Sequence, residues 1–188
     1  LPDIFHYWSN RYLKPVFDAV GITGVTDFFM SPMLDHCRAA VSANPHKRCK
    51  FVSLGSGHCE FEIEIAVKLK ELGFQNFTLE CLDITKPMLE TGKKSAEKKG
   101  VGQQMDFIEL DLNAWSMTEG DYDVVMANQS LHHFVELELL FEKIAKAIGH
   151  SGVFITSDII GRNGHMRWPE ALDIIQKFWA ELPDRCRY

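Results

Sequence analysis

The stretch Val52-Ser-Leu-Gly-Ser-Gly-His-Cys-Glu60 decides the fold class of this 188-residue chain. A short apolar run breaks into a Gly-x-Gly turn at Gly55 and Gly57, and a helix is expected directly after it. Because glycine has no Cβ, the backbone can turn sharply and a ligand can approach the main chain, while the free N–H groups of the helix point at the same place. The stretch is therefore typical of a unit that holds a nucleotide-type cofactor.

A second signal follows at a suitable distance. The strand-like run Phe77-Thr-Leu-Glu-Cys-Leu-Asp83 ends in a carboxylate 26 residues after Gly57 (83 minus 57). An acidic residue at the tip of a neighbouring parallel strand can accept hydrogen bonds from both ribose hydroxyls. The alternative role of Asp83 is to start the helix expected near Lys86. Thr85 before Lys86-Pro87 is a suitable cap for that helix, which leaves Asp83 free for the cofactor.

The third position of the glycine pattern discriminates between cofactors. A dinucleotide fingerprint requires Gly or Ala at the position of Glu60, where the helix packs beside a pyrophosphate. A carboxylate there repels phosphates. S-adenosylmethionine has no phosphate, so Glu60 counts against NAD and not against a methyl donor.

Strand-like and helix-like segments alternate after residue 50, which predicts a parallel sheet covered on both faces. The apolar periodicity places strands near 50–54, 77–82, 106–110, 122–127 and 152–157, and helices near 60–72, 86–99, 136–148 and 170–182. After the Gly-x-Gly turn, Phe61, Ile63 and Ile65 recur at every second position as in a strand, but their place directly after the turn favours a helix.

Two further helices, near 4–19 and 25–42, are expected before the sheet and are rich in aromatic residues. We interpret them as a lid over the cofactor edge. Packing against the flank of the sheet is the alternative, because aromatic residues on a helix are often core. The expected domains are a helical extension over 1–49 and a cofactor-binding domain over 50–188.

From about Phe51 to about Gly164 the sequence resembles the class I S-adenosylmethionine-dependent methyltransferases. Four stretches carry the resemblance in the family's order: Val52–Cys59, Leu82-Asp-Ile-Thr-Lys-Pro-Met-Leu89, Phe107-Ile-Glu-Leu-Asp-Leu112 and Tyr122-Asp-Val-Val-Met-Ala-Asn-Gln-Ser-Leu-His-His133. The resemblance implies an α/β fold, a three-layer, Rossmann-like, doubly wound and mostly parallel sheet with strand order 3-2-1-4-5. The family's closing pair of strands has no counterpart before Tyr188, so a truncated or incomplete domain is expected.

The resemblance also implies the cofactor, S-adenosylmethionine, and the residues that bind it. The main chain of Gly55, Ser56 and Gly57 would line its methionine and ribose part, and Asp83 would hold the ribose. Ile84 and Leu112 would flank the adenine, Asp111 would accept from its exocyclic amine, and Asn128 would line the donor near the sulfonium. Met88 is a further residue expected to bind the cofactor. For Asp111, a turn with Asn113 is the alternative role.

Two positions depart from the family pattern. The family usually has an acidic residue at the position of Ser53 and often a third glycine at that of Cys59. The group that neutralises the methionine ammonium is therefore open, with Glu60 a substitute by position.

Histidines near the ends of the fourth and fifth strands are candidate bases. His132, His133 and His165 lie where open α/β sheets bind ligands, and a histidine can accept the proton of a hydroxyl or amine acceptor. His133 and His165 are the catalytic candidates, and a structural role is the alternative for each. No metal site is expected, since the adjacent histidines lack a third ligand.

The loop Ile160-Gly-Arg-Asn-Gly-His-Met-Arg-Trp168 combines two arginines, a histidine and an aromatic residue near the same edge. Such a loop suits an anionic or polyhydroxylated small molecule. The alternative is an Asn-Gly turn whose Trp168 packs into the core.

Charge and cysteine content argue against several classes of binding partner and of cysteine-based scaffold. A net charge of −6 without a concentrated basic face argues against nucleic acid and anionic membranes as partners. Five widely spaced cysteines without a Cys-x-x-Cys pair predict neither a disulfide framework nor a zinc ribbon, and a cytoplasmic location is expected.

These observations predict a methyltransferase that transfers the methyl group of S-adenosylmethionine to a small molecule. Two alternatives stay open. One is an NAD-dependent oxidoreductase, and the other is a non-catalytic binding domain that retains the fold.

Overall fold

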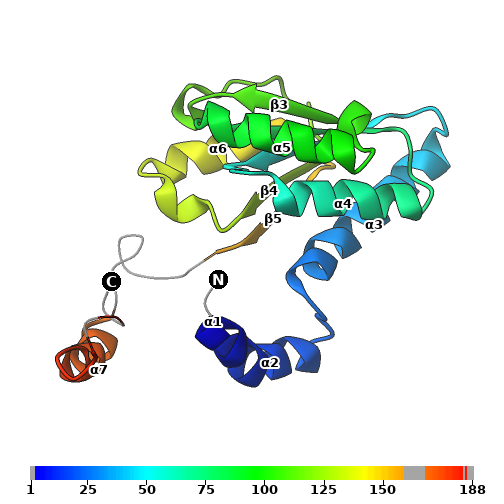
Figure 1. Ribbon diagram of the computed structural model, residues 1–188. Helices are drawn as coiled ribbons and strands as arrows, with labels where there is room; N and C mark the ends of the chain where they lie inside the picture. Colours follow the sequence, from blue (N-terminus) through cyan, green and yellow to red (C-terminus); the bar gives the residue numbers. More distant parts are fainter. Residues whose placement is uncertain (1–2, 159–167, 184, 186–188) are drawn as a thin grey trace.

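Five strands form one parallel sheet in the computed structural model, which describes residues 3–158, 168–183 and 185 (Figure 1). The strand order is β3-β2-β1-β4-β5, and every neighbouring pair is parallel. The strands are β1 (Cys49–Leu54), β2 (Phe77–Asp83), β3 (Met105–Glu109), β4 (Val124–Asn128) and β5 (Val153–Ser157). The predicted fold class and order are confirmed. Since the order reverses between β1 and β4, the carboxyl ends of these two strands border the crevice where such sheets bind ligands.

Helices lie where the periodicity predicted them. The helices α4 (Glu60–Glu71), α5 (Lys86–Lys98) and α6 (Leu137–Ile148) connect strands, and α7 (Pro169–Trp179) follows β5. Short 3-10 turns are η2 (Gly102–Gln104), η3 (Leu112–Ala114) and η4 (Leu131–His133). The segment after the glycine turn is helical despite its alternating apolar residues. Its Ile65, Ala66 and Leu69 are fully buried on one helical face, which explains why the helix is favoured.

The sheet separates two hydrophobic clusters, one on each face. Residues of α3, α4 and α5 pack with Phe51, Phe77 and Leu79 on one face. On the other face, α6 packs with Val52 and Leu54. Because successive side chains of a strand point to opposite faces, β1 contributes to both clusters. The result is the expected three-layer arrangement (Figure 1).

An N-terminal helical extension precedes the sheet, as predicted. It consists of α1 (Asp3–Trp8), the π-helical η1 (Ser9–Leu13), α2 (Lys14–Ala19) and α3 (Val25–Ala43). α3 contacts α4 and β5, and its fully buried Phe29 packs edge-to-face on Phe61, with ring centroids 4.9 Å apart. This helix therefore packs on the flank of the sheet. The role of the extension as a lid, like the division at residue 49, stays a prediction.

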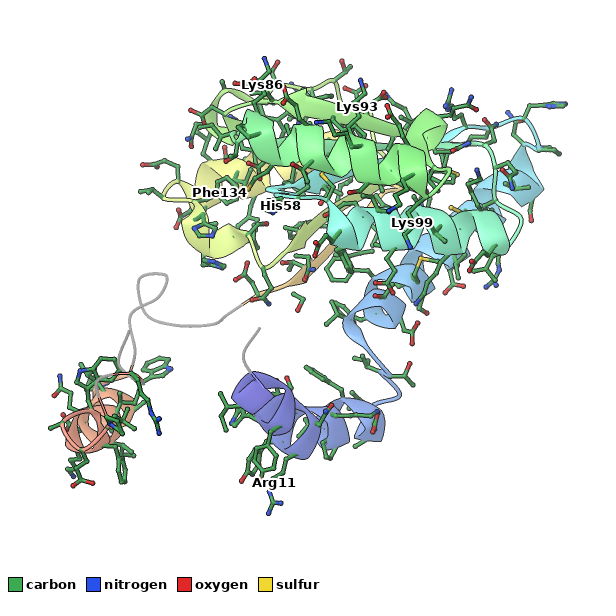
Figure 2. The ribbon with its side chains drawn as sticks, viewed as in Figure 1. Arg11, His58, Lys86, Lys93, Lys99 and Phe134 are labelled. Atoms are coloured by element: carbon green, nitrogen blue, oxygen red, sulfur yellow. The ribbon has the colours of Figure 1, made fainter. Side chains whose placement is uncertain are left out.

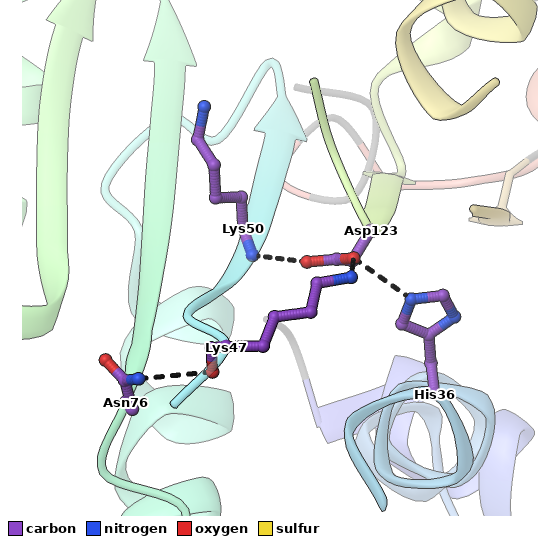
Figure 3. A network of polar contacts seen from close by, with 5 residues as sticks. All are labelled: His36, Lys47, Lys50, Asn76 and Asp123. Carbon is purple, nitrogen blue, oxygen red and sulfur yellow. Dashed lines mark hydrogen bonds and ion pairs between the residues drawn. The ribbon is translucent and has the colours of Figure 1, made fainter. Parts of the chain in front are cut away.

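A polar network fixes α3 and the start of β1 to β4 (Figure 3). Asp123 Oδ1 accepts from Lys47 Nζ at 2.5 Å and lies 3.2 Å from His36 Nε2, while Oδ2 accepts from the Lys50 N–H at 2.8 Å. Burial raises the pKa of Asp123, but the hydrogen bonds from Lys47, Lys50 and His36 outweigh it and hold the pKa below its ordinary value. The network lies at the amino end of β4, opposite the crevice, and its role is structural.

In the described part of the chain, no helix combines the length and apolar character needed to span a bilayer.

Candidate cofactor site

The glycine turn after β1 has a backbone that only glycine adopts easily. Gly55 and Gly57 have φ angles of 71° and 54°. A Cβ on Gly55 would lie 2.8 Å from the Cβ of Ser130, so this position also needs glycine for space. Ser130 in turn donates its hydroxyl to the Leu54 carbonyl at 2.6 Å. The turn is thus packed closely against the loop that follows β4.

Asp83 binds the glycine turn directly. Its Oδ2 accepts from the Gly57 N–H and its Oδ1 from the Thr85 N–H, both at 2.8 Å. Thr85 is the N-cap residue of α5, as expected, but its side chain makes no capping hydrogen bond there. Asp83 is not left free of the helix start, because it accepts from the Thr85 amide. The carboxylate is therefore held by two main-chain donors and still borders the cavity described next.

A cavity of about 550 Å³ opens at the carboxyl edge of the sheet. It is lined by residues from four separate segments. The predicted site residues among them are Gly55, Gly57, Asp83, Ile84, Met88, Asp111, Leu112 and His133. Volumes of roughly 300–1,000 Å³ are usual for small-molecule sites. The structure therefore brings these residues together around one ligand-sized space.

Asp111 forms the turn with Asn113 that was considered as its alternative role, and its contact with the adenine stays a prediction. Its Oδ1 accepts from the Asn113 N–H at 2.9 Å and from the Asn113 side-chain amide at 2.8 Å, which makes it the cap of η3. It also lines the cavity of about 550 Å³, beside Leu112, which is 5% exposed. The turn places the carboxylate at the cavity wall.

A second cavity, of about 230 Å³, shares Gly55 with the first. The remaining two predicted cofactor residues, Ser56 and Asn128, line this smaller cavity. Figure 2 shows His58 of the smaller cavity and Phe134 of the larger one at the same end of the sheet. The two cavities therefore meet at the glycine turn.

Residues 45–186 match a protein family described as "Methyltransferase domain". This chain belongs to the methyltransferase domain family. No curated protein matches the sequence.

Solved structures share the fold of this methyltransferase domain at low sequence identity. A geranyl diphosphate methyltransferase in complex with GPP and sinefungin has 14% identity and a TM-score of 0.54, covering 70% of this chain and 46% of its own. A coclaurine N-methyltransferase bound to N-methylheliamine and SAH has 19% identity and a TM-score of 0.51, covering 68% and 35%. The YcgJ protein from Bacillus subtilis has 16% identity and a TM-score of 0.51, covering 66% and 50%. The chain thus spans half or less of each structure's length.

Among the candidate bases of the methyltransferase domain, His133 lines the larger cavity. Its neighbour His132 is 9% exposed at the side chain, and its Nδ1 lies 2.6 Å from Asp158 Oδ1. Asp158 Oδ2 also accepts from the Leu131 N–H at 2.6 Å, so this pair orders the turn after β4. His165 and the arginines of the 160–168 loop lie outside the described residues, apart from Trp168, which is 54% exposed.

Glu62 also belongs to the site, although it is not among the predicted site residues. Its side chain lines the smaller cavity, is 3% exposed, and accepts from the Ser53 hydroxyl at 2.6 Å. Glu60, the substitute considered for the missing strand carboxylate, lines the same cavity but is exposed. A signal was present, because Glu62, Ile65, Ala66 and Leu69 follow the i, i+3, i+4, i+7 spacing of a buried helix face.

The described residues contain no group of three or more histidine, cysteine or acidic side chains arranged to hold a metal ion.

Proposed function

We propose that this chain binds S-adenosylmethionine in the two cavities and transfers its methyl group to a small-molecule acceptor. Membership of the methyltransferase domain family supports methyl transfer in general. The observation that carries the proposal is the larger cavity, which unites the glycine turn, the Asp83 carboxylate and the apolar Leu112 at the switch point of the sheet. Such a combination suits a ribose and a flat base attached to it.

The residues present fit the parts of the donor. In the larger cavity, Asp83 would accept from the ribose hydroxyls, and Ile84, Met88 and Leu112 would contact the adenine. Asp111 would accept from its exocyclic amine. Gly55, Ser56 and Gly57 would allow close approach of the main chain, and Asn128 would face the methionine part from the smaller cavity.

S-adenosylmethionine, when bound, supplies a methyl group on a sulfonium that leaves as a neutral thioether. The protein's main contribution is alignment of the acceptor with the methyl carbon, and such positioning accounts for up to roughly 7–11 kcal/mol of a barrier. His133 lies at the wall of the larger cavity, where its imidazole can take the proton from a hydroxyl or amine acceptor. His165 remains the second candidate for this role.

The acceptor is proposed to be a small molecule with anionic or polyhydroxylated groups. The arginines and histidine of the 160–168 loop, with Trp168, supply the chemistry that suits such groups. Two of the structural neighbours have small molecules bound, GPP in one and N-methylheliamine in the other, which supports an acceptor of small size.

An NAD-dependent oxidoreductase is the competing function, and Glu60 counts against it. In the structure this carboxylate lies at the wall of the smaller cavity, where it would repel a pyrophosphate on the glycine turn. A non-catalytic domain that retains the fold is the other competitor, and it predicts no binding of an adenosyl ligand.

Isothermal calorimetry of the chain with S-adenosylmethionine, S-adenosylhomocysteine and NAD tests the proposal. We expect both adenosyl ligands to bind and NAD not to bind. Binding of NAD alone would favour the oxidoreductase, and failure of all three to bind would favour the non-catalytic domain. Methyl transfer is then measured with radiolabelled donor and a panel of anionic and polyhydroxylated acceptors, with neutral apolar acceptors as controls.

A further inference from the structure

The smaller cavity contains a buried acid that has no cationic partner among the described residues. Glu62 projects from α4 and receives one side-chain hydrogen bond, from Ser53 on β1, at 2.6 Å. The charge that shifts its pKa is that of another carboxylate, Asp83 on β2, which raises it. A buried carboxylate without a cation is costly in its ionised form. Burial therefore favours the neutral form of this acid until a positive group arrives.

A second acceptor points to the same kind of ligand. The buried Oδ1 of Asn128, at the end of β4, has no hydrogen-bond partner in the described structure. Asn128 and Glu62 both line the smaller cavity. An unsatisfied buried acceptor costs roughly 1–3 kcal/mol, which a ligand with N–H donors would recover. An amide oxygen and a carboxyl group in one space favour a primary ammonium group.

The position of the smaller cavity identifies the source of that ammonium. It shares Gly55 with the larger cavity, and the consecutive residues Asn128 and Gln129 line one cavity each. A donor with its adenosine in the larger cavity would extend its amino-acid end into the smaller one. This step rests on the function proposed above.

We propose that Glu62 is the counter-ion of the α-ammonium group of S-adenosylmethionine, and that donor binding releases the carboxyl proton of Glu62 to solvent. In the balance of this step, the Glu62 carboxylic acid and the ammonium ion become a carboxylate–ammonium pair and one free proton. The carboxylate comes from the helix after the glycine turn, and Ser53 on β1 orients it by a hydrogen bond.

The groups around Glu62 raise the share of its neutral form before binding. Burial raises the pKa of Glu62 to about 7, against the lowering effect of the Ser53 hydrogen bond, and the charge of Asp83 raises it further. Cys81 on β2 is also affected by Glu62, and its own pKa is raised, first by its hydrogen bond with Cys59 and then by burial. Glu60 and His58 at the cavity wall are exposed.

The test is calorimetry with S-adenosylhomocysteine in buffers of different ionisation enthalpy, which counts the protons released on binding. With a pKa of about 7 for Glu62, we expect release of roughly 0.9 proton at pH 6 and roughly 0.1 at pH 8. The dissociation constant should accordingly rise roughly tenfold from pH 8 to pH 6.

The variant Glu62→Gln should abolish the proton release and weaken binding at pH 8 by roughly tenfold or more. Glu71→Gln is the matched control, because it removes an exposed acid from the far end of the same helix, and it should retain both properties. Glu60→Gln tests the other acid at the cavity wall. The probe 5′-methylthioadenosine, which lacks the amino-acid end, reports on folding and on the larger cavity. Its affinity should be the same in all three variants.

The outcomes separate this inference from the proposed function. If 5′-methylthioadenosine and S-adenosylhomocysteine both bind but no proton is released, and Glu62→Gln binds normally, the role of Glu62 is overturned while the cofactor site stands. If neither ligand binds the wild-type chain, the proposed function itself is overturned. Loss of proton release in Glu60→Gln would transfer the role to Glu60 and overturn the assignment to Glu62.

Discussion

The Asp83 carboxylate accepts a hydrogen bond from the Gly57 amide at 2.8 Å, which joins the acidic end of β2 to the glycine turn after β1. The two residues are 26 positions apart in the sequence and meet because β1 and β2 are parallel neighbours. An ionised carboxylate can accept roughly four hydrogen bonds, and Asp83 accepts one from the Gly57 amide and one from the Thr85 amide. We assign its remaining acceptor capacity to the hydroxyls of a ribose.

Replacement of Asp83 by Asn should weaken the binding of S-adenosylhomocysteine by roughly 1.5–3 kcal/mol, or about ten- to 150-fold. The amide has one acceptor oxygen and no charge, so it cannot serve the main chain and the ribose equally. Calorimetry measures the effect. Glu109→Gln is the control, because Glu109 is a half-exposed acid at the end of the adjacent β3. An unchanged affinity for Asp83→Asn would remove Asp83 from the site.

Replacement of Gly55 by Ala should destabilise the fold more than the same change at Gly100. Both glycines have φ near 70°, at 71° and 74°, so each alanine incurs a left-handed backbone cost of roughly 1–2 kcal/mol. At Gly100 the new Cβ meets no atom within 4 Å, but at Gly55 it lies 2.8 Å from the Ser130 Cβ. Overpacking adds roughly 1–3 kcal/mol. Urea unfolding should therefore show a larger loss of unfolding free energy for Gly55→Ala than for Gly100→Ala. Equal losses would mean that the loop containing Ser130 moves without cost to accept the new Cβ.

Replacement of Ile84 by Ala should affect ligand binding and leave stability nearly unchanged. Ile84 is 68% exposed although it lines the larger cavity, so its truncation creates no internal void. A bound adenine would cover it, and the lost contact should cost roughly 1 kcal/mol of binding. Leu72→Ala, at an exposed position after α4, is the control for both measurements. A large loss of stability in Ile84→Ala would instead show that Ile84 supports the core.

The strand order and the glycine turn could be predicted because their signals are local. Gly55 and Gly57 mark a sharp turn, and the strand runs around them are apolar and short. Asp83 was found at the correct strand end for the same reason. The N-cap position of Thr85 was predicted correctly, but the hydrogen bond from its amide to Asp83 was not, because that contact depends on how the loop between β2 and α5 folds.

The burial of Glu62 does not follow from the alternation of Phe61, Ile63 and Ile65, because that pattern places Glu62 on an exposed polar face. Only the helical spacing of Glu62 with Ile65 and Leu69 indicates it. Its burial depends on how α4 is rotated against β1, and the left-handed Cys59 before the helix, with φ of 60°, helps to set that rotation. The nine-residue separation between Ser53 and Glu62 spans a turn whose shape the sequence does not determine.

Replacement of Asp123 by Asn should destabilise the protein by roughly 1.5–3 kcal/mol at pH 7, because Lys47, Lys50 and His36 lose a charged acceptor. The pKa of Asp123 is lower in the folded protein than its ordinary value of 3.8. The contribution of the carboxylate is therefore complete above about pH 4 and is lost as the pH falls through the folded pKa. Urea unfolding of the wild type and of Asp123→Asn at pH 7 and pH 3 should show a difference in unfolding free energy that shrinks at the lower pH.

The exposed pair Lys14–Asp18 provides the control, since Asp18→Asn should change stability by less than about 0.5 kcal/mol at either pH. A difference for Asp123→Asn that persists undiminished at pH 3 would mean that the side chain stabilises the fold by shape and neutral hydrogen bonds, without its charge.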